Sequence, residues 1–449
     1  MKILLVNPPI TNRVKSSVSG FIDSFSSENP MPPLGLMYIA AYVKRCTEHD
    51  VQICDMVVGD PLLAILMKYK PDVVGITTTT LTLYDALQVA KMVKEYSKNI
   101  VTVIGGAHCD IYPYETASFK EFDYVIRGEG ELPFLRVLRG HDSKILDVEI
   151  IENIDSKPFP DRTLIDITKY HGTLARKPVT STVTGAGCSY SCSFCYQPHY
   201  SKHWRARSAS NVVEEMYLIQ RMGIGEIEIM DDTFTTDKQR VMDICDSLVF
   251  HKANASWSVD WNIRTRVDKV DLQMLQKMKL AGCKRINYGI ESYNPEVLKT
   301  LRKGFHVEQI EQTMRWTKEV GIEVQAYFML GSPYETFEQM RQTIDYAKKA
   351  KPDYAYFSLT SPMPGTAMYK WGLDEGRYTD YWRAYALNPT ADFTMNFWRQ
   401  EVRQEMIELL EYAYKSFYFR PDYILGQLLK VRSMDELTRK AKMALGMAK

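Results

Sequence analysis

The chain has 449 residues, 45% hydrophobic and 25% charged, which is typical of a globular protein with more than one domain. It carries 56 basic and 55 acidic residues and a formal net charge of +1, so we expect no nucleic-acid partner. No apolar run approaches the roughly 20 residues that span a bilayer. Residues 1–7 lack a signal-peptide pattern, which predicts a cytoplasmic protein with reduced thiols.

Residues 1–140 alternate short β-branched runs with helical patterns. Strands are predicted at residues 2–6, 51–57, 72–77, 100–105 and 123–127, and helices at 34–46, 61–70 and 83–98. This alternation predicts an α/β, Rossmann-like sheet, whose ligands bind beyond the carboxyl ends of the strands. The candidate binding residues in those loops are Asn7, Pro8, Thr77, Thr78, Thr79, Leu81, Gly105, Gly106, His108, Gly128, Glu129 and Gly130.

These loops are open to a plainer interpretation, because glycine and threonine also occur in the turns of any such sheet. No G-x-G-x-x-G follows the first strand, which argues against a dinucleotide ligand. His108 is either a ligand contact or an ordinary loop histidine with its hydrogen bonds satisfied. Residues 141–178 show little periodicity and several prolines, and we interpret them as a linker between two domains.

Residues 179–370 contain a second alternation, which predicts a partial (β/α)6 barrel of the TIM type. Strands are expected near 179–184, 226–231, 256–263, 284–290, 322–330 and 354–360, with helices near 210–222, 237–250, 271–281, 306–320 and 335–350. The active face of such a barrel lies at the carboxyl ends of its strands. Polar residues at those ends include Asp231, Asp232, Arg264 and Glu291, and Gly331 ends the fifth strand; each is also explicable as a cap or turn.

Three cysteines, Cys188, Cys192 and Cys195, follow the first predicted barrel strand within eight residues. Clustered thiolates favour an iron–sulfur cluster or zinc. His199 would complete a Cys3His zinc site, and chance clustering of buried thiols is the third interpretation.

The C-terminal region, residues 371–449, is rich in aromatic residues and is expected to be helical from about residue 399 to 417. Its rings either form a small core of their own or serve as a lid over an apolar substrate.

The motifs, taken in order, resemble those of the radical S-adenosylmethionine (radical SAM) superfamily. They are Cys188-Ser-Tyr-Ser-Cys192-Ser-Phe-Cys195, Met230-Asp-Asp-Thr-Phe234, Tyr288-Gly-Ile-Glu-Ser292, Phe328-Met-Leu-Gly-Ser-Pro333 and Met363-Pro-Gly-Thr366. Residues 1–140 are similar to the cobalamin-binding domain that precedes the barrel in one branch, at Pro32-Pro-Leu-Gly-Leu-Met-Tyr38, Gly105-Gly-Ala-His108 and Gly128-Glu-Gly-Glu131. The tail Phe419-Arg-Pro-Asp-Tyr423 is similar to C-terminal segments of that branch, which includes the class B methyltransferases.

The resemblance implies three cofactors: a [4Fe-4S] cluster, S-adenosylmethionine (SAM) and cobalamin in its methyl form. Cys188, Cys192 and Cys195 would hold the cluster and leave one iron open for SAM. The SAM contacts implied are Phe194, Tyr196, Asp231, Asp232, Arg264, Glu291 and Gly331. The loops of residues 1–140 named above would bind cobalamin, and the loop of residues 7–20 contains no histidine, which predicts no histidine ligand to cobalt from this loop.

The function implied is methylation of an unactivated carbon, with an adenosyl radical removing hydrogen and methylcobalamin giving the methyl group. A cyclase of the anaerobic tetrapyrrole type is the alternative. We reject a methylthiotransferase, because Cys46, Cys54 and Cys109 occupy positions that do not suggest a second cluster. The partners expected are a small-molecule or peptide substrate and an electron donor of the flavodoxin or ferredoxin type; the non-enzyme alternative is a zinc-containing binding protein.

Overall fold

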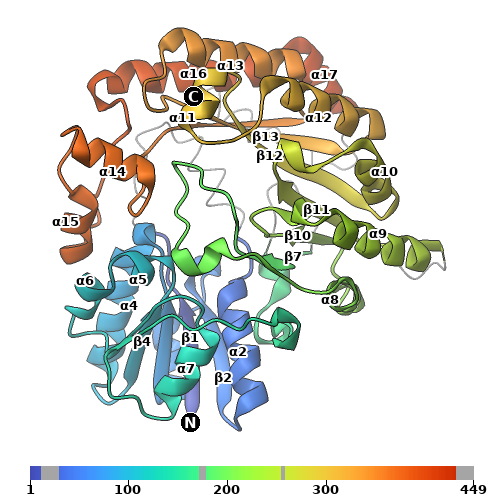
Figure 1. Ribbon diagram of the computed structural model, residues 1–449. Helices are drawn as coiled ribbons and strands as arrows, with labels where there is room; N and C mark the ends of the chain where they lie inside the picture. Colours follow the sequence, from blue (N-terminus) through green and yellow to red (C-terminus); the bar gives the residue numbers. More distant parts are fainter. Residues whose placement is uncertain (12–29, 171–177, 254–257, 431–449) are drawn as a thin grey trace.

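The computed structural model describes residues 1–11, 30–170, 178–253 and 258–430 (Figure 1). Its N-terminal part is built on a six-stranded parallel sheet in the order β2-β1-β3-β4-β5-β6. The strands are β1 (Lys2–Asn7), β2 (Asp50–Asp55), β3 (Val73–Thr77), β4 (Val101–Gly105), β5 (Tyr124–Ile126) and β6 (Ile145–Leu146). The predicted Rossmann-like sheet is confirmed, and β6 adds a short edge strand inside the segment predicted to be a linker.

Helices cover both faces of this sheet, because alternate residues of each strand point to opposite sides. Ile3 and Leu5 of β1 pack against α2 (Leu34–Cys46) and α7 (Glu131–Leu138). Leu4 and Val6 pack on the other side, against α3 (Leu62–Tyr69) and α4 (Leu83–Tyr96). Two short helices, α5 (Ala107–Ile111) and α6 (Pro113–Ala117), follow β4 and lead toward the second half of the molecule.

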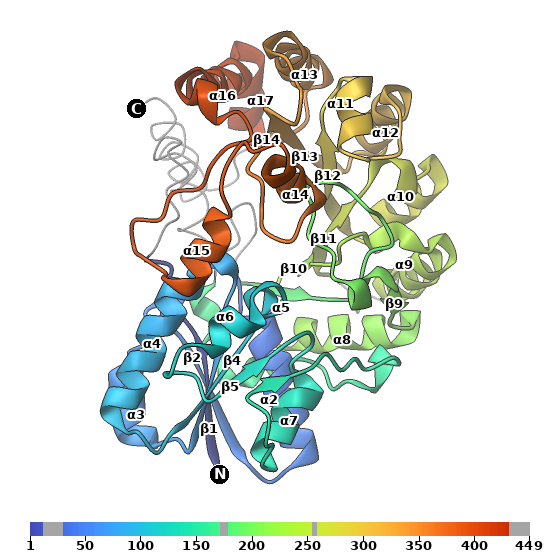
Figure 2. The ribbon, with the colours of Figure 1, turned by 60° about the vertical axis from the view of Figure 1, so that its left-hand side comes forward.

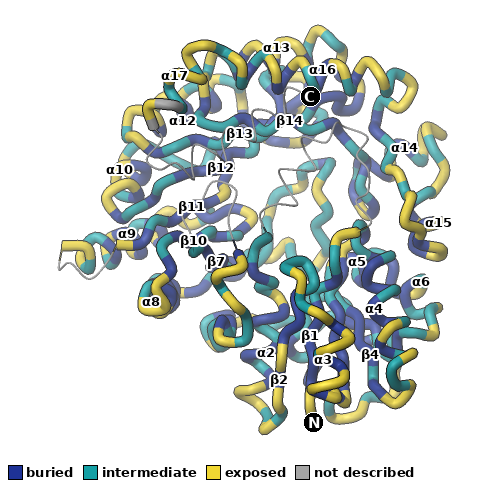
Figure 3. Tube along the Cα trace, turned by 180° about the vertical axis from the view of Figure 1, so that it is seen from behind, coloured by how far each residue is buried: buried dark blue, intermediate teal, exposed yellow. Residues whose placement is uncertain are grey.

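The second half is an open barrel of six parallel strands in the order β14-β13-β12-β11-β10-β7, which confirms the predicted partial barrel. Its strands are β7 (Val179–Thr182), β10 (Glu226–Ile229), β11 (Asp260–Thr265), β12 (Cys283–Glu291), β13 (Glu323–Leu330) and β14 (Tyr354–Leu359). The outer layer consists of α8 (Ala209–Arg221), α9 (Lys238–Ala253), α10 (Leu272–Leu280), α11 (Pro295–Thr300), α12 (Val307–Val320) and α13 (Phe337–Ala350). In Figure 3 the barrel strands are buried or intermediate, while the helices expose their outer faces.

Alternation along the barrel strands separates an apolar outer face from a polar inner one. Trp261 and Ile263 of β11 belong to the core beneath the helices. Arg264 lies between core residues on the same strand, is exposed, and is in register with Asn287 of β12. The open barrel therefore has a polar interior where a closed barrel has packed apolar layers.

The C-terminal region joins the two halves. Helices α14 (Ala367–Asp374) and α15 (Tyr381–Leu387) follow β14, and α16 (Arg403–Tyr418) and α17 (Pro421–Lys430) complete the barrel's outer layer. Trp382 and Tyr385 of α15 belong to the same buried cluster as Leu4 of the N-terminal sheet, and α15 lies beside α6 (Figure 2). Trp382 is fully buried in this cluster. Helix α15 therefore joins the C-terminal region to the N-terminal core, and its rings do not form a separate small core.

Candidate functional site

The three cysteines lie on a loop that emerges from the carboxyl end of β7. Strands β8 (Gly185–Ala186) and β9 (Arg205–Ala206) pair antiparallel and close the base of this loop. The backbone N–H of Cys188 donates to the carbonyl of Ser201 at 2.8 Å. Gly187, at φ +92°, permits this approach, because a Cβ there would lie 2.5 Å from the Ser201 oxygen. We call residues 187–206 the cluster loop.

Neighbouring elements anchor the cluster loop at two further points. Asp231, at the end of β10, accepts hydrogen bonds from the backbone N–H and the hydroxyl of Thr184, both at 2.6 Å. Ser193 donates its N–H to Leu301 and its hydroxyl to Thr300 at the end of α11, each at 3.1 Å. Asp231 therefore holds the entry to the loop, where both of its carboxylate oxygens accept hydrogen bonds.

The thiols lie near the surface, where a cofactor can reach them. Cys188 and Cys192 are half-buried and Cys195 is exposed, with the Nε2 of Gln197 3.5 Å from its sulfur. Within the described part of the chain, no three His, Cys, Asp or Glu side chains converge on a single metal ion. A four-iron cluster offers each of three thiolates a different iron, so the donor set of this loop fits the cluster.

Residues predicted to contact SAM surround the cluster loop at the ends of the other strands. Glu291 ends β12 at φ +65° and forms an ion pair with the buried Lys303 at 3.2 Å. The Lys303 ammonium also lies 5.7 Å from the centre of the Phe194 ring, so this pair connects Glu291 to the cluster loop. Asp232 and Arg264 are exposed at the ends of β10 and β11.

Gly331 shapes the end of β13. Its φ is +80°, and a Cβ there would lie 2.6 Å from the terminal methyl of Met406 in α16. The N–H groups of Gly331 and Ser332 both donate to Oε2 of Glu335, at 2.8 and 2.9 Å. Tyr196 packs similarly close to Gly365, where a Cβ would lie 2.7 Å from its ring. A side chain at Gly331 or Gly365 would therefore collide with Met406 or Tyr196, respectively.

The loops at the carboxyl edge of the N-terminal sheet form a compact rim. The N–H of Thr78 donates to the carbonyl of Gly105 at 2.8 Å, and the hydroxyl of Thr82 caps Thr79. Gly106 has φ +114°, and a Cβ added there would lie 2.3 Å from the backbone oxygen of Thr78. Leu81 packs at the edge of the core and Asn7 donates to Asp55 at 2.9 Å.

His108 is buried in this rim, with its Nδ1 3.2 Å from the hydroxyl of Thr80. Its Nε2 is buried without a hydrogen-bond partner among the described residues. Burial lowers the pKa of His108 to about 3, so the ring is neutral. An unsatisfied ring nitrogen and the close-packed glycine beside it fit a large ligand seated on this edge. Residues 12–20 of the first loop, including the stretch without histidine, lie outside the described residues.

Two contacts connect this rim to the barrel's cysteine-bearing side. The hydroxyl of Tyr200 donates to Asp110 at 2.6 Å, and the guanidinium of Arg205 pairs with Glu129. Glu129 also pairs with Lys157 at 2.8 Å. Gly128 donates its N–H to the other oxygen of Asp110 at 2.6 Å. The predicted cobalamin residue Glu129 therefore contacts the cluster loop directly, and Gly128 is connected to it through Asp110.

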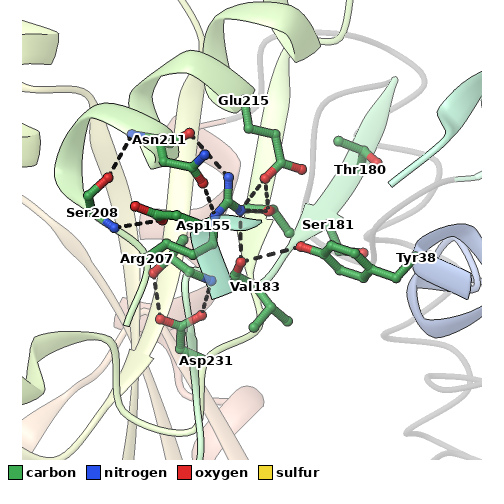
Figure 4. A network of polar contacts seen from close by, with 12 residues as sticks. Tyr38, Asp155, Thr180, Ser181, Val183, Arg207, Ser208, Asn211, Glu215 and Asp231 are labelled. Atoms are coloured by element: carbon green, nitrogen blue, oxygen red, sulfur yellow. Dashed lines mark hydrogen bonds and ion pairs between the residues drawn. The ribbon is translucent and has the colours of Figure 1, made fainter. Parts of the chain in front are cut away.

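A buried polar network supports the end of β7 (Figure 4). Glu215 of α8 pairs with Arg207 and, at 2.7 Å, with Arg162 from the predicted linker. Burial alone would raise the pKa of Glu215, but the two guanidinium groups lower it, so it stays ionised. Tyr38 of α2 points at the carbonyl of Val183, 3.5 Å away. The network joins α2, the linker and the barrel.

Sequence reasoning missed Asp110, Tyr200, Lys303 and Glu335. The last was detectable, because it lies two residues after the motif that ends at Pro333. The first two are 90 residues apart and join only through the fold. Tyr200 gave no signal in a stretch dominated by the cysteines.

Two cofactor sites that face each other define the class of protein: a radical SAM enzyme that also carries cobalamin. The family model described as "Radical SAM superfamily" matches residues 182–347, and the one described as "B12 binding domain" matches residues 23–138. No helix in the described ranges has both the length and the apolar character to cross a membrane.

Known proteins agree with this class. An uncharacterized methyltransferase of Pyrococcus horikoshii is 34% identical, and the alignment covers 96% of this chain and 95% of that protein. The anaerobic magnesium-protoporphyrin IX monomethyl ester cyclase of Rubrivivax gelatinosus is 26% identical over 76% of this chain and 66% of its own. The solved structure of the cobalamin-dependent radical enzyme OxsB, with aqua-cobalamin bound, superposes with a TM-score of 0.75 at 16% identity, covering 100% of this chain and 71% of that one.

The chain belongs to the radical SAM superfamily, in the branch whose barrel follows a cobalamin-binding domain. Its cofactors are a [4Fe-4S] cluster, SAM and cobalamin, and its reaction class is that of a cobalamin-dependent methyltransferase.

Proposed function

We propose that the chain methylates an unactivated carbon of a small-molecule or peptide substrate held between the cluster loop and the rim of the N-terminal sheet. The observation that carries this proposal is the direct contact between those two structures through Asp110, Tyr200, Glu129 and Arg205. When bound, the cluster and SAM supply a hydrogen-abstracting radical and methylcobalamin supplies the methyl group.

The chain's own contribution on the barrel side is binding and orientation. Cys188, Cys192 and Cys195 would ligate the cluster, and Phe194 and Tyr196 would flank the adenine. Glu291, held by Lys303, offers a carboxylate to the ribose or amino group of SAM. Asp232 and Arg264 are exposed at neighbouring strand ends, where opposite charges suit the amino and carboxylate groups of the methionine end.

On the other side, cobalamin would lie along the rim that includes Pro8, Thr77, Thr78, Thr79, Leu81, Gly105, Gly106, His108, Gly128, Glu129 and Gly130. The buried Nε2 of the neutral His108, which has no hydrogen-bond partner among the described residues, would donate one hydrogen bond to this ligand or accept one from it. Gly106 allows the close approach of the Thr78 backbone that shapes this rim. We propose residues 1–140 as the cobalamin-binding unit, 141–178 as linker, 179–370 as barrel and 371–449 as C-terminal region.

An external one-electron donor of the flavodoxin or ferredoxin type would reduce the cluster. The exposed Cys195 supports a short path from the protein surface to the cluster.

The test is anaerobic incubation of the loaded enzyme with candidate substrates deuterated at carbon. Transfer of deuterium into 5′-deoxyadenosine together with the mass gain of one methyl group supports the proposal. A methylated product without deuterium transfer contradicts it.

Ring closure is the second candidate, because a magnesium-protoporphyrin ester cyclase is among the relatives. The same incubation separates the two. Deuterium transfer with loss of hydrogen from the product and no methyl gain would favour the cyclase.

A further inference from the structure

Asp110 occupies a position between the two cofactor sites that neither motif assigns. Its Oδ1 accepts the backbone N–H of Gly128 at 2.6 Å, in the loop proposed to bind cobalamin. Its Oδ2 accepts the hydroxyl of Tyr200 at 2.6 Å, in the cluster loop. One carboxylate thus bonds to both loops, which are otherwise separate in sequence.

Tyr200 is connected to two of the cysteines through its neighbour Ser201. The carbonyl of the next residue, Ser201, accepts the backbone N–H of Cys188 at 2.8 Å. The Ser201 hydroxyl donates to Gln197 at 3.0 Å, and the Nε2 of Gln197 lies 3.5 Å from the sulfur of Cys195. A displacement of Tyr200 therefore changes the positions of Cys188 and Cys195.

The Asp110–Tyr200 bond is strong enough to carry such a coupling. Burial and the bond to Asp110 raise the pKa of Tyr200, so its hydroxyl stays protonated and donates. A hydrogen bond to a carboxylate is stronger than one between two neutral groups. The hydrogen bond between Tyr200 and Asp110 is partly buried, so water competes for it less than at the protein surface.

We propose that Asp110 and Tyr200 are positioning residues that couple cobalamin binding to the geometry of the cluster loop, so that each cofactor strengthens binding of the other. A ligand that orders the Gly128 loop fixes Asp110, and Asp110 fixes Tyr200 and through it the cysteines. A bound cluster strengthens cobalamin binding by the same coupling free energy, because coupling between two binding sites is reciprocal. The cluster is thus held in its working geometry when the methyl donor is in place. This inference rests on the proposed function.

The test is the dissociation constant of hydroxocobalamin, measured by fluorescence quenching with cluster-free and with cluster-loaded enzyme. We expect the cluster to tighten cobalamin binding by about 5- to 100-fold in the wild type. Tyr200→Phe removes one oxygen atom and leaves the Arg205–Glu129 pair between the same loops, so we expect it to reduce this ratio by about 3- to 10-fold. Tyr114→Phe, on the exposed side of α6, is the matched control and is expected to keep the wild-type ratio.

Asp110→Asn gives a second and less severe test, because the uncharged amide can still bond to both loops. We expect its ratio of the two cobalamin dissociation constants to lie between those of the wild type and Tyr200→Phe. Iron content and circular dichroism confirm that each variant is folded and loaded. A wild-type ratio in Tyr200→Phe, or a ratio of one in the wild type, would overturn the coupling while leaving methyl transfer intact. Failure of hydroxocobalamin to bind either form would overturn the proposed function as well.

Discussion

Oε2 of Glu335 accepts a hydrogen bond from the backbone N–H of Gly331 at 2.8 Å, and this bond fixes the turn after β13. The other carboxylate oxygen, Oε1, is buried without a hydrogen-bond partner among the described residues. Burial raises the pKa of Glu335 from 4.5 to about 7, against the opposing effect of the N–H donors. The folded protein thus binds this proton more tightly than the unfolded chain.

Glu335→Gln is expected to remove a pH dependence of stability. Because the folded pKa is raised, Glu335 contributes stability that is fully present below pH 4.5 and is lost as pH rises toward 7. Glutamine keeps the acceptor oxygen and cannot ionise. The free energy of unfolding of the variant, relative to that of the wild type, should therefore rise by about 1–3 kcal/mol between pH 5 and 8. Thermal unfolding across that range measures the difference, and a constant difference would refute the assignment.

Gly106→Ala should abolish tight cobalamin binding and leave the cluster in place. A Cβ at this position would lie 2.3 Å from the oxygen of Thr78, so the rim must move. Gly140→Ala is the control, since Gly140 also has positive φ, +81°, but has nothing within 4 Å of the added carbon; it should cost about 1 kcal/mol of stability and keep cobalamin. Equal cobalamin titrations for the two variants would show that the rim is not the binding site.

Glu291→Ala leaves the buried Lys303 ammonium without its carboxylate. Loss of one member of a buried pair costs about 3–5 kcal/mol, and SAM binding should weaken as well. Asp374→Ala breaks the exposed Lys370–Asp374 pair instead and should cost below about 1 kcal/mol. Urea denaturation of both variants provides the comparison. Similar losses of unfolding free energy in Glu291→Ala and Asp374→Ala would mean that Lys303 finds another partner.

Trp382→Ala tests the bridge between α15 and the N-terminal core. The side chain is fully buried and its indole N–H donates to the carbonyl of Pro362 at 2.9 Å. Removing a buried tryptophan costs about 3–5 kcal/mol, whereas Phe250→Ala, at a ring 66% exposed, should change little. A large loss of stability supports the bridge; a loss as small as that of Phe250→Ala would be expected of a mobile lid.

Cys192→Ala should lose the visible absorption of the cluster, and His199→Ala should keep it. The reason is that the cluster needs all three thiolates, while His199 is exposed on the loop. Cys46→Ala, at an exposed cysteine on α2, is the control. Metal binding that depends on His199 would restore the zinc interpretation.

The sequence predicted both sheets because their strands are β-branched runs at regular spacing, and α2 begins and ends where its apolar periodicity does. It could not predict β6, since two residues give no periodicity. Asp231 and Asp232 were equivalent in sequence, because both follow β10, which ends at Ile229. The structure directs Asp231 to Thr184 and leaves Asp232 exposed.

The contacts between the two halves were the least predictable part. Asp110 and Tyr200, like Glu129 and Arg205, are brought together only when both sheets have formed and packed. The aromatic tail was ambiguous for the same reason. Its composition indicates burial, but only the fold shows that Trp382 and Tyr385 are buried against the N-terminal sheet.

The most direct test of a two-cofactor site is the iron and cobalt content of one chain, measured by native mass spectrometry after anaerobic reconstitution with iron, sulfide and hydroxocobalamin. The account predicts a single species that carries about four irons and one cobalamin together, with the irons lost in Cys192→Ala. A chain that binds zinc in place of iron, or in which cluster and cobalamin exclude each other, would contradict it.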